Sequence, residues 1–288
     1  MANIHDEELG RRAFVTTMSV AAGVAAAGVT TVTAEAAMEV VEKDVDIKTA
    51  DGTCDAAFFH PATGAHAAVL IWPDAFGLRP SLRAMGKRMS GEGYSVLVVN
   101  PFYRVAKNPF TDASTVDFAK ERGKITPLMA SINAPGAAEK DAQAFIAWLD
   151  AQKEVDKTKK VGTQGYCMGG PLVVRTAATV PDRVGAGGSF HGGGLVSDQP
   201  TSPHLLAPKI KAKMLFAIAA SDDKQRPTDK DGLKKAFPDA HVEVFEGTFH
   251  GWCIADMPKQ GDGAQTYNMA SAEKAWGELL ALYKSALA

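Results

Sequence analysis

The 288-residue sequence contains few cysteines and none of the short patterns that hold metals or phosphates. Its three cysteines form no C-x-x-C pair, so a zinc-ribbon or thioredoxin-like protein has no support. No H-E-x-x-H segment offers zinc ligands, and no glycine-rich phosphate loop follows the first expected parallel strand. Lysine and arginine number 31 against 33 aspartates and glutamates, without a long basic run. We therefore expect no metal, no cofactor and no nucleic-acid partner.

Long apolar runs are also missing, except near the N-terminus. Elsewhere no segment reaches the roughly 18 uninterrupted apolar residues that a membrane span requires. Residues 13–34 are rich in Ala, Gly, Thr and Val, and they follow the pair Arg11-Arg12. This segment is similar to a twin-arginine secretory signal, with a retained membrane anchor as the alternative. We expect residues 1–36 to be a cleaved signal peptide and residues 37–288 to be an exported, periplasmic protein without a membrane partner.

The odd number of cysteines matters in an exported protein, because at least one thiol must stay unpaired. The three are Cys54, Cys167 and Cys253. A disulfide between Cys54 and Cys253 is possible, and the sequence leaves it open.

Strand-like and helix-like segments alternate along most of the chain. Short apolar runs such as residues 67–72 indicate strands covered on both faces, whereas residues 139–152 repeat apolar side chains at helical spacing. Earlier, two strand-like segments flank the turn signal Asp51-Gly52 and should pair antiparallel. The expected strands cover residues 39–48, 54–60, 67–72, 94–99, 160–164, 184–190, 214–219 and 241–245, and the expected helices residues 80–92, 113–122, 139–152, 169–180, 229–237 and 268–287. This order predicts a single α/β domain over 37–288, with a mostly parallel central sheet, helices on both faces and antiparallel strands at the N-terminal edge.

The sharpest motif is G-Y-C-M-G-G at residues 165–170, which has the form G-x-nucleophile-x-G. A strand precedes it and a helix follows it, which is the context that a nucleophile elbow requires. So tight a reversal strains the backbone at Cys167, and the flanking Gly165 and Gly169 relieve crowding because they lack Cβ atoms. The helix N-terminus favours the thiolate, and the backbone N–H of Met168 points where an oxyanion would form.

A nucleophile of this kind needs an acid and a histidine downstream, in that order. The strand expected at residues 214–219 ends at Asp222 and Asp223, and His250 lies in the loop after the last strand. We favour Asp222 as the acid because it follows its strand more directly, with Asp223 as the alternative. Among seven histidines the rival of His250 is His191, at another strand end, where it could line the pocket without being the base.

Together these motifs resemble the dienelactone hydrolase family, which has the α/β-hydrolase fold. The resemblance rests on the G-Y-C-M-G-G elbow, on S-D-D after the next-to-last strand and on F-H-G-W around His250. In addition, W-P-D-A-F-G at residues 72–77 is similar to the family's E-x-F-G segment. The resemblance extends over most of the chain after the signal.

The resemblance implies roles for further residues. It implies a Cys-His-Asp triad, here Cys167, His250 and Asp222, and an acid that interacts with the nucleophile, here Asp74 in place of the usual Glu. The second oxyanion donor would be the backbone N–H of Ala75. An arginine that binds a substrate carboxylate corresponds to Arg104. The candidates for contact with the substrate, all at or after strand ends, are Tyr103, Arg104, His191 and Trp252.

These residues predict a hydrolase that attacks a small carboxylic ester or lactone with Cys167 and forms a thioester acyl-enzyme. The alternatives are a general carboxylesterase or thioesterase, a redox-active thiol protein in which Cys253 resolves an oxidised Cys167, and a non-catalytic binding module on the same scaffold. The only partner that the residues indicate is a small-molecule substrate, and they indicate no oligomeric state.

Overall fold

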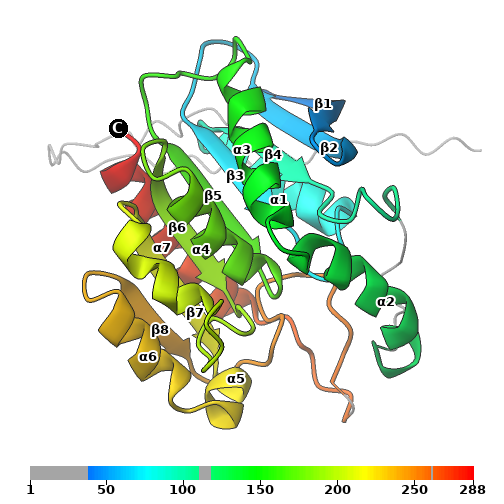
Figure 1. The fold of residues 1–288 in the computed structure, drawn as a ribbon, viewed down its shortest axis with the longest axis vertical. Helices are drawn as coiled ribbons and strands as arrows, with labels where there is room; N and C mark the ends of the chain where they lie inside the picture. Colours follow the sequence, from blue (N-terminus) through cyan, green and yellow to red (C-terminus); the bar gives the residue numbers. More distant parts are fainter. Residues whose placement is uncertain (1–37, 110–117, 261) are drawn as a thin grey trace, which may run out of the picture. The chain divides into compact units, whose positions relative to one another are not determined.

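The computed structural model describes residues 38–109, 118–260 and 262–288 (Figure 1). The expected signal peptide, residues 1–36, therefore lies outside the described residues. Within the described ranges, no helix is both long enough and apolar enough to cross a membrane.

The strands that the structure describes form one sheet of eight, in the order β1-β2-β4-β3-β5-β6-β7-β8 (Figure 1). They are β1 (Val40–Thr49), β2 (Gly52–Pro61), β3 (Ala68–Trp72), β4 (Ser95–Val99), β5 (Val161–Tyr166), β6 (Val184–Phe190), β7 (Lys213–Ala219) and β8 (His241–Phe245). β1 pairs antiparallel with β2, and β2 pairs antiparallel with β4. The other neighbouring strands are parallel. The predicted α/β class, with antiparallel strands at the N-terminal edge, is confirmed.

Helices cover both faces of this sheet, and a separate apolar core fills each side. One core joins the sheet to α3 (Ala137–Asp150), α4 (Gly169–Thr179) and α6 (Asp229–Ala236). The other joins it to α1 (Pro80–Gly91) and α7 (Met269–Ala286). Every residue of β3, β4 and β5 is buried. Strands β3 and β4 are accordingly apolar or small-residue runs, as expected for strands between two helical layers, whereas β5 also contains buried Gln164, which donates a hydrogen bond to Tyr166.

One helix differs from its prediction. The pattern predicts a helix over residues 113–122, part of which lies outside the described residues, but α2 (Phe118–Asn133) runs on through Pro127. Pro127 and the preceding glycine hide this extension in the sequence, since both disfavour a helix interior. Leu128 and Ile132 are buried in the core, so tertiary packing outweighs the weak local propensity.

Two short elements that the sequence did not indicate follow later strands. The 3₁₀ helix η2 (Pro203–Lys209) packs beside α4, and α5 (Ala220–Gln225) begins directly after β7. The second matters for function, because it converts the expected loop at Asp222 and Asp223 into a helical turn that separates the directions of the two carboxylates.

Candidate active site

Cys167 lies at the turn between β5 and α4, at the carboxyl ends of the parallel strands. Its φ of +54° is in the left-handed region that non-glycine residues rarely adopt. A Cβ on Gly165 would lie 2.2 Å from the carbonyl oxygen of Gly169, and a Cβ on Gly169 would lie 2.4 Å from the carbonyl oxygen of Trp72. Neither position can hold a side chain without backbone movement, which is why the reversal requires both glycines.

His250 and Asp222 lie together at the same edge of the sheet. Nδ1 of His250 donates a hydrogen bond to Oδ2 of Asp222 at 2.8 Å, and the backbone N–H of His250 donates to Oγ of Ser221 at 3.0 Å. Asp223 instead accepts a hydrogen bond from Lys230 at 2.8 Å. Of the two neighbouring carboxylates, Asp222 is thus the one that contacts the histidine. The contribution of Ser221 was not predicted, and its place directly before Asp222 is the only hint of it.

The thiol of Cys167 also interacts with the His250 imidazole. Burial disfavours the charged imidazole, but the interactions with Asp222 and with Cys167 outweigh burial and raise the pKa of His250 to about 10. His250 is therefore protonated at neutral pH. An imidazolium between a carboxylate and a sulfur atom can stabilise a thiolate and later release a proton.

Two backbone N–H groups next to this cluster form no hydrogen bond with a described residue: those of Met168 and Ala75. Met168 directly follows Cys167. A Cβ on Gly169 would lie only 2.8 Å from the carbonyl oxygen of Pro73, so the loop that carries Ala75 packs against the elbow. Unused donors beside a nucleophile are the groups that stabilise the negative oxygen of a tetrahedral intermediate.

Asp74 does not extend to the nucleophile in this structure. Its side chain is almost fully buried, and its two oxygens accept hydrogen bonds from Arg79 at 2.7 and 2.9 Å. Oδ1 also accepts the backbone N–H of Phe76 at 2.9 Å. The expected contact with Cys167 is therefore replaced by an ion pair with Arg79, because a buried carboxylate requires a paired charge and Arg79 supplies it.

Arg79 is a residue that the sequence interpretation missed. It donates two hydrogen bonds to Asp74 and two more, both at 2.8 Å, to Asp256. Only 2% of its side chain is exposed. It thus fastens the loop after β3 to the loop that follows His250, two segments that must keep their spacing for the site to work. No spacing signal in the sequence connects the three residues.

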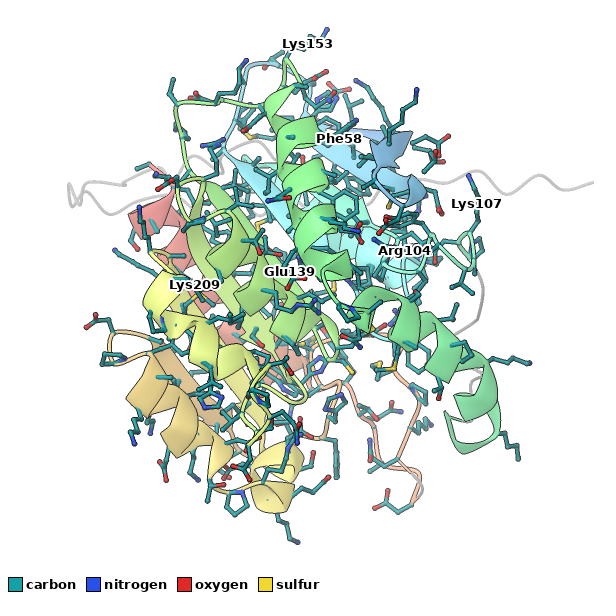
Figure 2. The ribbon with its side chains drawn as sticks, viewed as in Figure 1. Phe58, Arg104, Lys107, Glu139, Lys153 and Lys209 are labelled. Atoms are coloured by element: carbon teal, nitrogen blue, oxygen red, sulfur yellow. The ribbon has the colours of Figure 1, made fainter. Side chains whose placement is uncertain are left out.

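Tyr103 and Arg104 form a structural cluster instead of a free anion-binding site. The guanidinium of Arg104 donates to Asp51 at 2.8 Å and to Asp141 at 2.7 Å, and it lies 4.6 Å above the ring of Tyr103. The hydroxyl of Tyr103 also donates to Asp141 at 2.8 Å. Figure 2 shows Arg104 between the β1–β2 hairpin and α3. Two carboxylates already neutralise its charge, so the expected binding of a substrate carboxylate has no geometric support.

Trp252 and His191 are both buried. Trp252 has no exposed surface and stacks on Phe245 with 4.5 Å between ring centroids. It is therefore a core residue that cannot touch a substrate. His191 is 1% exposed, and its ring centroid lies 4.8 Å from that of His250. Of the four residues expected to contact the substrate, His191 alone packs directly on the cluster.

The three thiols are free. Cys54 packs in the core on the α3 and α4 side of the sheet, whereas Cys253 packs against the core on the α1 and α7 side. The disulfide left open by the sequence is thus absent, because the sheet separates the two residues. Burial raises the pKa of both thiols well above the usual range, so neither is a nucleophile near neutral pH.

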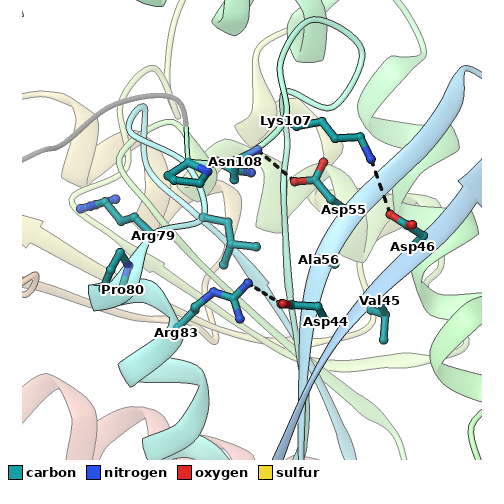
Figure 3. Close-up of a pocket in the computed structure, with 12 residues that line it drawn as sticks. Asp44, Val45, Asp46, Asp55, Ala56, Arg79, Pro80, Arg83, Lys107 and Asn108 are labelled. Atoms are coloured by element: carbon teal, nitrogen blue, oxygen red, sulfur yellow. Dashed lines mark hydrogen bonds and ion pairs between the residues drawn. The ribbon is translucent and has the colours of Figure 1, made fainter.

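A cavity of about 430 Å³ lies elsewhere, between the β1–β2 hairpin and the start of α1 (Figure 3). Its walls carry charges of both signs, and most are already paired. Arg83 donates to Asp44 at 2.5 Å, and Lys107 lies 3.8 Å from Asp46. No residue of the Cys167 cluster lines it. It therefore adds nothing to the chemistry of the elbow.

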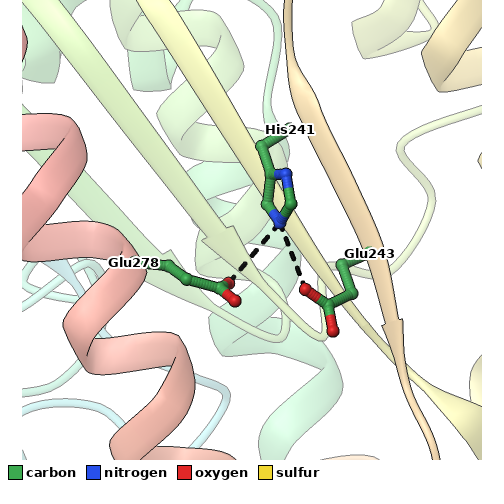
Figure 4. A group of neighbouring side chains, drawn as sticks. All are labelled: His241, Glu243 and Glu278. Carbon is green, nitrogen blue, oxygen red and sulfur yellow. Dashed lines mark hydrogen bonds and ion pairs between the residues drawn. The ribbon is translucent and has the colours of Figure 1, made fainter.

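Among the residues that the structure describes, one group has ligand types that suit a metal: His241, Glu243 and Glu278 (Figure 4). Nε2 of His241 lies 3.1 Å from Glu243 and 3.7 Å from Glu278. The ammonium of Lys274 forms ion pairs with both carboxylates, so the chain supplies its own cation here. The group also lies at the start of β8, whereas the Cys167 cluster lies where the strands end.

Parallel sheets in which a nucleophile occupies a strained turn between a central strand and a helix are typical of hydrolases, and the fold and site place this protein in that class. Sequence comparison narrows the class. Residues 54–287 match the Dienelactone hydrolase family, and the chain belongs to that family. Membership identifies the protein as a hydrolase that acts on esters or lactones.

Individual relatives agree with this assignment. A protein from Synechocystis sp., provisionally named carboxymethylenebutenolidase, is 26% identical over 234 residues, which cover 78% of this chain and 89% of that protein. Carboxymethylenebutenolidase from Rhodococcus opacus is 27% identical over 139 residues, which cover 47% of this chain and 48% of the relative.

Solved structures agree on the fold. A dienelactone hydrolase-like promiscuous phosphotriesterase from metagenomic libraries matches with a TM-score of 0.68 and 21% identity, over 86% of this chain and 99% of that chain. A provisionally assigned dienelactone hydrolase from Klebsiella pneumoniae matches with a TM-score of 0.66 and 19% identity, over 85% and 99% of the two chains.

Proposed function

We propose that the protein hydrolyses a small carboxylic ester or lactone, with Cys167 as nucleophile, His250 as the proton carrier and Asp222 as the residue that orients His250. The single observation that carries the proposal is the position of the His250 ring. It interacts with the thiol of Cys167 and donates a hydrogen bond, at 2.8 Å, to Asp222. The order of the three residues along the chain is the one that strand-end hydrolases require.

The reaction follows from this arrangement. The sulfur of Cys167, with its proton held by His250, attacks the carbonyl carbon, and the carbonyl oxygen becomes negative. The N–H groups of Met168 and Ala75 receive that oxygen, and each donor stabilises the transition state by about 3 kcal/mol. The imidazolium of His250 then protonates the leaving alkoxide, and a thioester to Cys167 remains. His250, now neutral, takes a proton from water, which attacks the thioester and releases the acid.

The substrate class is a lactone or a small activated ester. Support comes from family membership and from relatives named as carboxymethylenebutenolidases. General carboxylesters and thioesters pass through the same tetrahedral intermediate, so a panel of lactones, esters and thioesters distinguishes these activities by their kcat/KM values.

The test uses Cys167→Ala and His250→Ala with a small activated ester such as p-nitrophenyl acetate, and Cys253→Ala as the matched thiol control. We expect the first two variants to lose activity by about 10³-fold or more, whereas the control retains it. In wild type, mass spectrometry should detect an acetyl adduct on the peptide that contains Cys167. Hydrolysis at the wild-type rate by Cys167→Ala or His250→Ala would contradict the assignment. A sulfenic acid trapped by dimedone on Cys167, together with absent esterase activity, would favour the redox alternative.

We further propose that residues 1–36 direct export by the twin-arginine route. The support is the pair Arg11-Arg12 ahead of a low-charge segment that ends in small residues. Replacing both arginines by lysine in the full chain should leave the protein in the cytoplasm with an uncleaved N-terminus. An unchanged periplasmic level, measured by cell fractionation, would contradict the route.

A further inference from the structure

His191 combines two unfavourable features at one position. It directly follows β6 with a φ of +39°, a conformation that costs an ordinary residue about 1–3 kcal/mol. Its backbone is held there, because its N–H donates to the carbonyl oxygen of Ala217 in β7, at 2.8 Å. Its side chain is 1% exposed, and neither ring nitrogen has a hydrogen-bond partner among the described residues.

An unpartnered polar ring inside a protein is normally replaced by an apolar one, because each buried unsatisfied group costs about 1–3 kcal/mol. Features of this kind persist where function requires them. Burial, and then the charge of His250, lower the pKa of His191 well below the usual value. The ring is therefore neutral while its neighbour is protonated.

The neighbour that His191 touches is the ring of His250. The two centroids are 4.8 Å apart and the planes make an angle of 73°, an edge-to-face contact. The ring of Tyr166 also lies near His191, with 6.2 Å between ring centroids. Tyr166 itself stacks on Phe190, with 5.2 Å between centroids. Tyr166 and Phe190 are the last residues of β5 and β6, so these rings lie at the carboxyl edge of the sheet. The hydrogen bond to Asp222 fixes one atom of the His250 ring, and the contact with His191 restricts how the ring can turn about that bond.

We propose that His191 is a positioning residue whose buried ring packs edge-to-face on His250 and holds that imidazole between Cys167 and Asp222. This inference rests on the proposed function for its catalytic meaning. His191 is not a second base and does not touch substrate, because both of its nitrogens are inaccessible. Neutrality is part of the role, since a second positive ring at this distance would repel the imidazolium of His250.

The test compares two variants that separate ring from backbone. His191→Asn removes the ring but keeps a residue that tolerates positive φ, whereas His191→Phe keeps a planar ring of similar shape without titratable nitrogens. We expect kcat to fall about tenfold or more in the Asn variant, with KM within about twofold of wild type. The Phe variant should keep kcat within about threefold, which a role in proton transfer would not allow.

A second measurement follows the His250 ring directly. In wild type and in the Phe variant, NMR should detect the Nδ1 proton of His250 as a slowly exchanging downfield signal, because the hydrogen bond to Asp222 is held in place. The Asn variant should lose that signal through faster exchange while its thermal unfolding remains cooperative. If the Asn variant does not fold, His191→Gly, which accepts φ of +39° without strain, replaces it.

The outcomes separate this inference from the proposed function. An Asn variant with wild-type kcat and an intact Nδ1 signal would overturn the positioning role while leaving the hydrolase assignment in place. A Phe variant as inactive as the Asn variant would also overturn it. If wild type hydrolyses none of the esters or lactones, the proposed function fails, yet loss of the NMR signal in the Asn variant and its retention in the Phe variant would still establish the positioning.

Discussion

Asp222 and His250 are joined by a hydrogen bond of 2.8 Å between Oδ2 and Nδ1, whereas the adjacent Asp223 pairs with Lys230. The first turn of α5 produces this division, because consecutive residues of a helix point about 100° apart. Two carboxylates that are neighbours in sequence therefore have different partners. Asp222 orients the imidazole of His250, and Asp223 of α5 pairs with Lys230 of α6.

This division predicts different effects for two isosteric substitutions. Asp222→Asn should lower kcat by about 10³-fold, because an amide no longer stabilises the imidazolium or enforces its orientation. Asp223→Asn, the matched control, should remain within about twofold of wild type, because the carboxylate of Asp223 pairs with Lys230 and not with His250. Steady-state hydrolysis of an activated ester measures both. Equal losses in the two variants would show that the carboxylates share the task.

The raised pKa of His250 has a consequence for stability against pH. Since the folded value of about 10 exceeds the usual value of 6.5, the protonated ring stabilises the folded state fully below pH 6.5. That stabilisation should decline as pH rises from 6.5 to 10, where the folded protein also loses the proton.

Urea unfolding at several pH values tests this, with His250→Gln as the control that cannot titrate. The difference in free energy of unfolding between wild type and the variant should shrink across this window. A difference that stays constant from pH 6 to 10 would mean that His250 is neutral in the folded protein and that its pKa is not raised.

The sheet and the elbow could be predicted from sequence because each is a local signal. Buried strands are short apolar runs, and Gly165 and Gly169 mark a reversal that excludes Cβ atoms. The choice between Asp222 and Asp223 needed the helical turn of α5, which no pattern announced. Arg79 is a case in which sequence reasoning fails altogether, since its partners Asp74 and Asp256 are brought to it only by the tertiary fold.

At three positions, the side-chain contacts in the structure differ from the roles that the family resemblance implies. Asp74, Arg104 and Trp252 lie at positions to which the resemblance assigns roles, yet each side chain has a partner inside this chain. Asp74 forms an ion pair, Arg104 contacts two carboxylates, and Trp252 stacks on a core ring. A motif fixes the backbone path of a loop better than it fixes the direction of its side chains. Those directions depend on which buried charges and rings lie opposite.

The elbow glycines give a test of stability. Gly165→Ala should destabilise the fold by about 3 kcal/mol or more, because its methyl group would lie 2.2 Å from a backbone oxygen that cannot rotate away. Gly193→Ala is the control, since nothing lies within 4 Å of its added Cβ although its N–H bonds to the carbonyl of Cys167. That control should change stability by only about 0.5 kcal/mol. Chemical denaturation measures the free energy of unfolding of both variants. A loss in Gly165→Ala as small as that in Gly193→Ala would show that movement of α4 relieves the crowding at Gly165.

Arg79 and Arg83 allow the stability contributed by a buried ion pair to be compared with that of more exposed pairs. Arg79→Ala should cost about 3–5 kcal/mol of unfolding free energy, because it leaves the buried carboxylate of Asp74 without a counter-charge. Arg83→Ala, one helical turn further along α1, removes pairs with the more exposed Glu42 and Asp44 and should cost about 0–1 kcal/mol.

The double variant Arg79→Ala/Asp74→Ala tests whether the unpaired carboxylate of Asp74 causes the loss of stability in Arg79→Ala. Removing Asp74 as well should restore part of the stability lost in Arg79→Ala, because no buried charge then remains unpaired. It should not restore kcat, since the loop that carries the Ala75 N–H would no longer be fastened to the loop after His250. Full recovery of kcat in the double variant would mean that the fastening has no part in holding the oxyanion donor.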